Sequence, residues 1–155
     1  MKNFTLQFVF VAATLLTTCG CSKQQFASPE KKLTGKWKFE KVTFQKQFSL
    51  CNKDVSDDFK GVSVEFKNDK TVFYTDTNSG LVYAGNYDLR PLSNGIYNYA
   101  GEYTNTQIGY ELDINLASGS DLKNYSGENV SVTLKKIFFT ETKNDGFYSY
   151  HLMKQ

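Results

Sequence analysis

The fold is decided by the stretch GVSVEFKNDKTVFYTDT, residues 61–77. In its first part the apolar residues Val62, Val64 and Phe66 alternate with polar ones, and this period of two is typical of a β-strand with one buried face. The polar triplet at 68–70 predicts a turn, and residues 71–77 are again rich in β-branched and aromatic side chains. The stretch therefore predicts two antiparallel strands joined by a tight turn.

The same alternation extends in both directions from this hairpin. It predicts further strands at residues 35–45, 81–89, 96–103, 108–116, 130–140 and 147–153. A change of phase between Phe39 and Val42 predicts a bulge near Lys41. Pro91 is expected to end one strand, the Asn-Gly pair at 94–95 to form a hairpin turn, and the polar residues 117–128 to form a loop.

Eight strands with short connections predict an all-β fold. Only residues 52–60 leave room for a helical turn, so a parallel sheet with crossover helices is disfavoured. We expect an eight-stranded antiparallel up-and-down β-barrel, because closure removes the exposed sheet edges. A two-sheet β-sandwich is the alternative. A barrel of eight strands has an interior that side chains fill or that holds one small ligand.

Composition excludes several classes of protein. The chain has 155 residues, enough for one domain, and it contains 13 Phe, 10 Tyr and 1 Trp. Its 18 Lys and Arg nearly balance its 16 Asp and Glu, which argues against a nucleic-acid-binding protein. Three cysteines are too few for a small domain built on disulfides.

The first twenty residues have the pattern of a secretory signal. Lys2 supplies a positive charge, and FVFVAATLL at 8–16 is an apolar run too short to span a bilayer, which needs roughly 20 residues. The following LTTCGCS resembles a bacterial lipoprotein signal, in which cleavage before a cysteine precedes acylation of its thiol. Gly20 favours Cys21 as the acylated residue, with Cys19 as the alternative, and an ordinary secretory leader without lipid is the other interpretation.

The domain organisation follows from this signal. We expect a signal peptide at 1–20, a lipidated cysteine and flexible tether at 21–32, and a barrel domain at 33–155. If Cys21 carries the lipid, Cys51 is left as a free thiol, which we expect to be small, buried and inert. If Cys19 carries it, Cys21 is free to pair with Cys51.

Several motifs in the barrel region resemble bacterial lipocalin-like domains. Leu33 to Trp37, LTGKW, is similar to the G-x-W opening of the first lipocalin strand, and VEFKNDKTVFY at 64–74 and KKIFFTETKNDGFYSYHLMK at 135–154 resemble later strands. The resemblance implies a barrel closed at one end by Trp37, with a basic residue of the last strand packed over it. The only Arg is Arg90, in mid-chain, so Lys135, Lys136 or Lys154 would have to take that place.

A set of aromatic residues is the main candidate for binding. The candidate ligand-binding residues are Trp37, Phe66, Tyr83, Tyr87, Tyr97, Tyr99 and Tyr103. If the tyrosines face inward, they line a pocket for a small hydrophobic or aromatic ligand; if they face outward, they form a surface for a protein partner or for inhibition of an envelope enzyme. Simple cross-strand packing is the third interpretation.

The sequence carries no recognisable catalytic machinery, and we expect a non-catalytic protein without cofactor or metal. Glu111 and Asp113 share one strand face about 7 Å apart, a spacing of interest for glycoside hydrolysis, but they alternate with apolar residues and are expected on the solvated face. Ser22 lacks the Asp that retains lipoproteins at the inner membrane of well-studied Gram-negative bacteria. By this resemblance we expect an anchor in the outer membrane, facing the periplasm.

Overall fold

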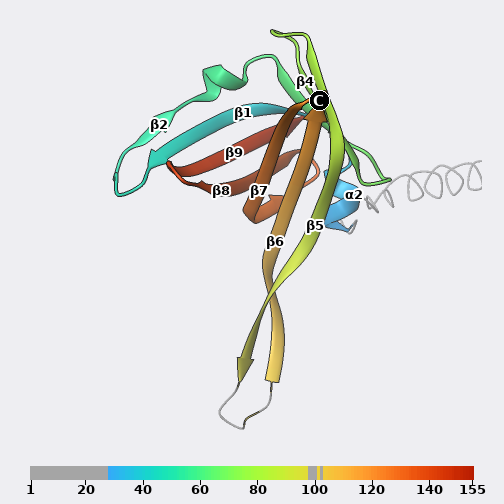
Figure 1. Ribbon diagram of the computed structural model, residues 1–155. Helices are drawn as coiled ribbons and strands as arrows, with labels where there is room; N and C mark the ends of the chain where they lie inside the picture. Colours follow the sequence, from blue (N-terminus) through green and yellow to red (C-terminus); the bar gives the residue numbers. More distant parts are fainter. Residues whose placement is uncertain (1–27, 98–100, 102) are drawn as a thin grey trace, which may run out of the picture.

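The chain forms a closed antiparallel β-barrel in the computed structural model (Figure 1). The structure describes residues 28–97, 101 and 103–155, and for 94–97 and 103–108 it describes the backbone alone. Eight strands close through pairing of β1 with β9, and the short β2 is added to β1. The barrel prediction is confirmed. The elements are α2 (Pro29–Leu33), β1 (Gly35–Lys46), β2 (Asn52–Asp54), the 3₁₀ helix η2 (Ser56–Phe59), β3 (Val62–Phe66), β4 (Thr71–Asp76), β5 (Leu81–Tyr97), β6 (Tyr103–Ser118), β7 (Asp121–Val132), β8 (Lys136–Lys143) and β9 (Gly146–Lys154).

Strand β1 closes the barrel and also extends beyond it. It pairs with β9 from Trp37 to Lys46, and the register shifts between Phe39 and Lys41, which confirms the predicted bulge. Its first residues pair with β3, and its residues 43–45 pair with β2. The β1–β2 hairpin therefore projects from the barrel, and it reaches the left edge of the molecule in Figure 1.

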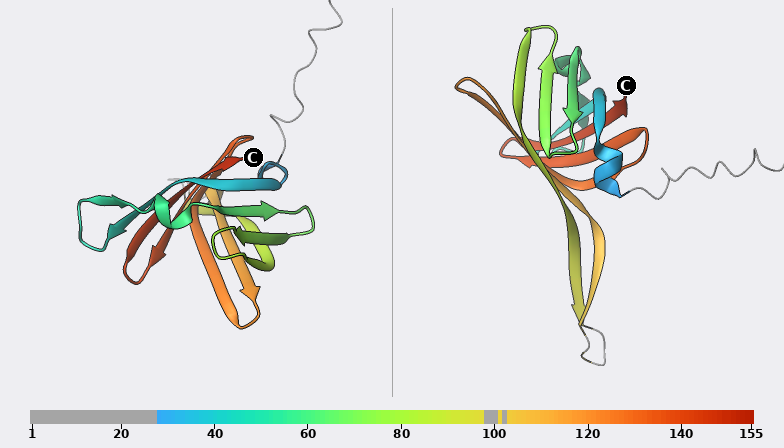
Figure 2. Two further views of the ribbon diagram at one scale, coloured as in Figure 1. Left: turned by 90° about the horizontal axis from the view of Figure 1, so that it is seen from above. Right: turned by 90° about the vertical axis from the view of Figure 1, so that its right-hand side faces the viewer.

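Strands β5 and β6 are much longer than predicted and form a two-stranded ribbon (Figure 2). The predictions that Pro91 ends a strand and that Asn94-Gly95 forms the turn are wrong, because all three residues pair with β6. Pairing of β5 with β4 stops at Asn86, so Pro91 lies on an edge where its missing N–H costs no ladder bond. Of the predicted strand 96–103, residues 96–97 are instead the end of β5 and Tyr103 is the start of β6, while residues 98–100 and 102 lie outside the described part of the chain.

The predicted loop at 117–128 is also wrong, because most of it belongs to β7. Its inward-facing residues include Lys123 and Gly127 rather than a run of large apolar side chains, which hid the alternation. The single predicted strand 130–140 is divided by a turn at 133–135 between β7 and β8. Three predicted strands thus correspond to β5 and β6, and one predicted strand corresponds to β7 and β8. These two errors cancel, so the predicted number of barrel strands was correct.

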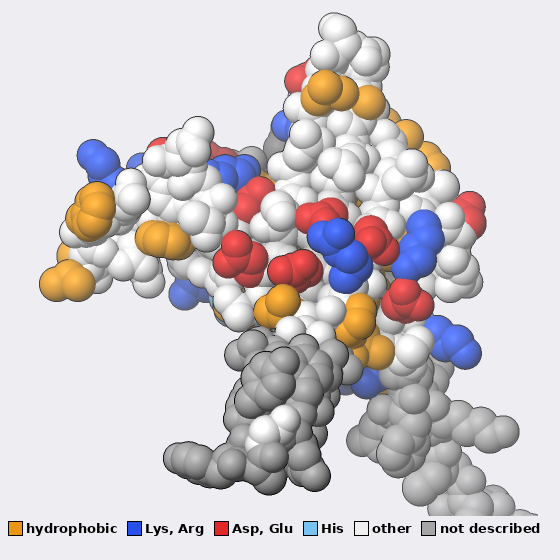
Figure 3. All heavy atoms as spheres, turned by 60° about the horizontal axis from the view of Figure 1, so that its bottom comes forward, with side chains coloured by type: hydrophobic (Ala, Val, Ile, Leu, Met, Phe, Trp, Pro, Cys, Tyr) orange, Lys and Arg blue, Asp and Glu red, His pale blue; other side chains and the backbone are white. Residues whose placement is uncertain are grey.

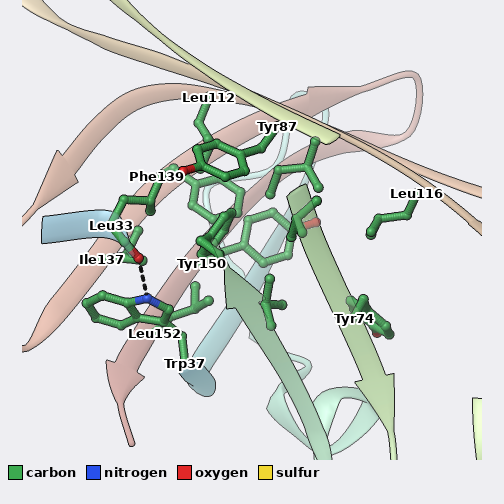
Figure 4. Close-up of a cluster of buried hydrophobic side chains, with 14 of the residues drawn as sticks. Leu33, Trp37, Tyr74, Tyr87, Leu112, Leu116, Ile137, Phe139, Tyr150 and Leu152 are labelled. Carbon is green, nitrogen blue, oxygen red and sulfur yellow. Dashed lines mark hydrogen bonds between the residues drawn. The ribbon is translucent and has the colours of Figure 1, made fainter. Parts of the chain in front are cut away.

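The helix α2 covers one end of the barrel. It lies at Pro29–Leu33, so residues 29–32 of the expected flexible tether are helical. Ser28 caps it, since its hydroxyl accepts from the N–H of Lys31 at 3.4 Å. Leu33 is fully buried and joins the core beneath the helix (Figure 4).

The core fills the barrel. It is built from alternate residues of the strands, so the period of two seen in the sequence matches the inward face. The largest fully buried side chains are Trp37, Tyr150, Phe66, Leu33, Leu112, Ile137, Leu152, Val42 and Val72. The closed sheet and this core lie within residues 33–155, so the barrel contains the elements of a self-contained fold.

Candidate functional site

Trp37 closes the end of the barrel beneath α2. Its indole Nε1 donates a hydrogen bond to the carbonyl of Leu33 at 2.7 Å, drawn in Figure 4. The Nζ of Lys154 lies 5.1 Å from the centroid of the indole ring and donates to the carbonyl of Thr34 at 2.8 Å. Of the three lysines considered for this place, Lys154 occupies it. Trp37 therefore has a structural role at this end of the barrel, and its only hydrogen-bond donor is already engaged.

Three further candidate residues lie in the core. Phe66 and Tyr87 pack edge to face with ring centroids 5.0 Å apart, and the Tyr87 hydroxyl donates to the carbonyl of Lys67 at 2.8 Å. The hydroxyl of Tyr83 donates to the carboxylate of Asp121, and this bond raises the pKa of Tyr83 to about 12. These rings are buried and their hydroxyls are engaged by the protein itself, as the packing interpretation expects.

A small cavity lies among the core side chains of the barrel. It measures about 10 Å³, roughly what a single water needs. Pockets for drug-sized ligands measure about 300 Å³ or more. The geometry of the described residues therefore favours the scaffold interpretation over a ligand-filled barrel. The cavity is lined by Phe39, Val64, Phe66, Tyr74, Ile114, Leu116, Tyr125, Ile137, Phe139 and Leu152.

Of the remaining three candidates, Tyr97 and Tyr103 belong to the projecting ribbon. Tyr97 and Tyr103 pair with each other at the ends of β5 and β6. Their side chains, and Tyr99 as a whole, lie outside the described residues. Their predicted role in binding stays a prediction.

A buried carboxylate that the sequence analysis did not single out lies at the opposite end from Trp37. Glu141 is 4% exposed, and its carboxylate accepts from the Tyr150 hydroxyl at 2.9 Å and from the backbone N–H of Ser126 at 3.1 Å. The Nζ of Lys143 lies 3.1 Å from it. Burial, and then the negative charge of Glu141, raise the pKa of Tyr150 well above its usual range. This network satisfies a charge that would otherwise be costly to bury.

Two lysines cover tyrosine rings at the same end. Lys143 Nζ lies 5.4 Å from the ring centroid of Tyr125 and 5.2 Å from that of Tyr148. Lys123 Nζ lies 5.4 Å from the ring centroid of Tyr74 and 4.9 Å from that of Tyr83. These are cation–π distances, so the amino groups of both lysines lie over tyrosine rings. The arrangement closes this end of the core instead of opening it to a ligand.

The two carboxylates considered for hydrolysis lie on the outer face of the barrel. Glu111 and Asp113 both contact the guanidinium of Arg90, with Glu111 at 3.7 Å and Asp113 in a direct hydrogen bond. Asp113 also accepts from the hydroxyl of Ser126 at 3.0 Å. Figure 3 shows such acidic and basic side chains intermixed on one face of the barrel. Arg90 thus holds the pair in a surface ion network, as expected for a solvated face.

The tip of the β1–β2 hairpin exposes large apolar side chains. Phe48 is 97% exposed and Leu50 is 99% exposed, and hydrophobic side chains gather over this hairpin at the left of Figure 3. Phe48 also has a φ of 64°, uncommon for a bulky residue. Exposed apolar groups of this size have nothing to pack on within the described chain, and such groups often mark a contact surface.

Cys51 lies at the same tip. It is exposed, so the expectation of a buried thiol is wrong, and it has no disulfide partner among the described residues. The reason is its place in a turn, where its N–H bonds the Ser49 hydroxyl at 3.2 Å and no strand carries it into the core. Cys19 and Cys21, the candidates for lipidation, lie outside the described residues.

The described residues include no group of three or more His, Cys, Asp and Glu side chains placed to hold a metal ion. In the same part of the chain, no helix is long and apolar enough to cross a membrane. Comparisons with family models, curated proteins and solved structures find no match. The lipocalin-like resemblance therefore stays a prediction beyond the barrel fold itself.

Proposed function

We propose that this chain is a non-catalytic lipoprotein of the cell envelope, anchored through acylated Cys21, whose solid barrel serves as a scaffold that binds a partner protein. The outer membrane, facing the periplasm, is the proposed site of the anchor. The observation that carries the proposal is a contrast in burial. The barrel interior is filled, while Phe48 and Leu50, the two most exposed large apolar side chains of the described residues, lie on a projecting hairpin.

Burial of apolar surface can supply binding free energy at the exposed hairpin but not inside the barrel. A cavity of about 10 Å³ offers no surface for an apolar ligand to bury. Phe48 and Leu50, in contrast, would each gain about 1.5–3 kcal/mol on full burial against a partner. A partner protein is favoured because β2 also has an outer edge without a strand neighbour in the described sheet, where backbone pairing is available.

The anchor is tested by metabolic labelling with an alkyne-tagged palmitate in a bacterial host. We expect label on the full-length chain and on Cys19→Ala, and loss of label on Cys21→Ala. Cys19→Ala is the matched control, since it removes the neighbouring thiol two residues away. Label that is lost with Cys19→Ala and kept with Cys21→Ala would contradict acylation of Cys21 and assign the anchor to Cys19. No label on any form would contradict the lipoprotein proposal.

The binding surface is tested by photocrosslinking in the native envelope. A photoreactive phenylalanine analogue at position 48 is compared with the same analogue at position 122, since Leu122 is also exposed, at 68%, but lies on β7. We expect a discrete adduct from position 48 that disappears when Leu50→Ser is added, and no such adduct from position 122. Identical adducts from both positions, or none from position 48, would contradict the proposal.

A further inference from the structure

An open groove lies between α2 and the turn that joins β7 to β8. It has a volume of about 400 Å³ and is lined by Lys32, Val132, Thr133, Leu134 and Lys135. Val132 and Leu134 are half-buried, so their apolar surface forms the floor of the groove. The groove therefore combines an apolar floor with a lysine on each side.

The lysines around this groove have no ion pair with a carboxylate in the described part of the chain. No carboxylate of the described residues lies within 4.0 Å of the amino groups of Lys31, Lys32 or Lys135. The carboxylates nearest in sequence are already paired with other lysines. For Lys31 and Lys32 they are Glu30, which is 2.6 Å from Lys70, and Glu40, which is 3.5 Å from Lys136. For Lys135 the nearest is Glu141, which is 3.1 Å from Lys143.

We propose that this groove binds the anionic headgroups of a phospholipid bilayer. Two features favour a bilayer over a partner protein: the lysines offer charge complementarity to lipid phosphates, and the apolar floor suits the boundary between headgroups and acyl chains. All five lining residues come from α2 and from the end of β7 with the turn that follows it.

The inference rests on the proposed anchor for its place in the cell. Ser28, the helix cap, is seven residues after Cys21, and a fully extended chain of that length spans at most about 25 Å. The anchor would thus hold the α2 end of the barrel close to the bilayer. Lipid anchoring is reinforced by nearby basic residues, each contributing on the order of 1 kcal/mol at an anionic surface.

The test uses the chain from residue 22, which carries no acyl group, after circular dichroism has verified its β structure. Sedimentation with vesicles of phosphatidylcholine alone is compared with vesicles containing 30% phosphatidylglycerol, at low salt. The test variant is Lys32→Gln with Lys135→Gln. The matched control is Lys46→Gln with Lys53→Gln, which removes the same charge from exposed positions on the β1–β2 hairpin.

We expect binding to the anionic vesicles only, with a partition coefficient that the groove variant lowers on the order of tenfold and the control variant leaves within twofold. Added salt should weaken binding of the unmodified chain. Equal losses in the two variants, or no binding to anionic vesicles, would overturn the inference. Because this chain has no acyl group, its result is independent of the palmitate labelling that tests the proposed anchor.

Discussion

The buried carboxylate Glu141 makes Tyr150→Phe a sharp test of how this core is held together. The substitution removes one hydroxyl and keeps the ring, which packs 4.7 Å from Phe139 between centroids, so it leaves no cavity of side-chain size. It deletes the 2.9 Å hydrogen bond to a carboxylate that is almost fully buried. Hydrogen bonds to charged groups contribute about 1.5–3 kcal/mol to stability.

The expected magnitude lies toward the lower part of that range. Glu141 keeps the N–H of Ser126 at 3.1 Å and the amino group of Lys143 at 3.1 Å, so the carboxylate is not left without partners. We expect a loss of about 2 kcal/mol in the free energy of unfolding. For a domain of this size that corresponds to a fall in Tm of about 8 °C.

The assay is urea and thermal unfolding followed by circular dichroism, with Tyr148→Phe as the matched control. Tyr148 lies two residues away on β9, and its hydroxyl donates at 3.3 Å to the exposed Asp145. We expect the control to change the free energy of unfolding by less than about 0.5 kcal/mol. In a Glu141→Gln background the effect of Tyr150→Phe should shrink, because the charged acceptor is gone. Equal effects of the two Tyr→Phe changes would refute the reasoning.

Three further predictions follow from contacts elsewhere in the barrel. Burial raises the pKa of Tyr125 in the folded state, whereas an unfolded tyrosine titrates near pH 10; its contribution to stability is therefore intact below about pH 10 and lost as the pH rises further, which urea unfolding from pH 8 to 11 measures. Gly85→Ala would place a Cβ 1.8 Å from the backbone oxygen of Asn115, so β5 and β6 must separate, and we expect a loss of about 1–3 kcal/mol in the free energy of unfolding by the same assay. Lys154→Met keeps a side chain on Trp37 but removes the cation, and we expect a loss of about 1 kcal/mol in the free energy of unfolding and a change in tryptophan fluorescence. Unchanged fluorescence would contradict contact between the amino group and the indole ring.

The architecture was predictable from the sequence because the inward faces of most strands are made of apolar residues. The alternation at 61–77 places two strands and their turn correctly, and the phase change near Lys41 locates a real bulge. The alternation fails at β7, where Lys123 faces inward and its amino group lies over the rings of Tyr74 and Tyr83. A charged residue in that position is indistinguishable, in one sequence, from a residue of a polar loop.

Features that depend on distant neighbours were not predictable. Pro91 is a strand breaker by local rules, and it is tolerated here only because β4 has already ended beside β5. Glu141 is an ordinary acidic residue in the sequence, and its burial depends on Tyr150 and Ser126 from other strands. Which side of the sheet Tyr83 and Tyr87 face was left open by the sequence, and the structure buries both rings in the core.

Native mass spectrometry of the acylated chain, released from membranes in mild detergent, tests the central claim most directly. The account predicts a chain that begins at Cys21, carries the mass of its acyl groups and retains no additional small molecule inside the barrel. A further small molecule that stays bound in native spectra and is lost on denaturation would contradict the solid-scaffold account, since the filled core has no room for it.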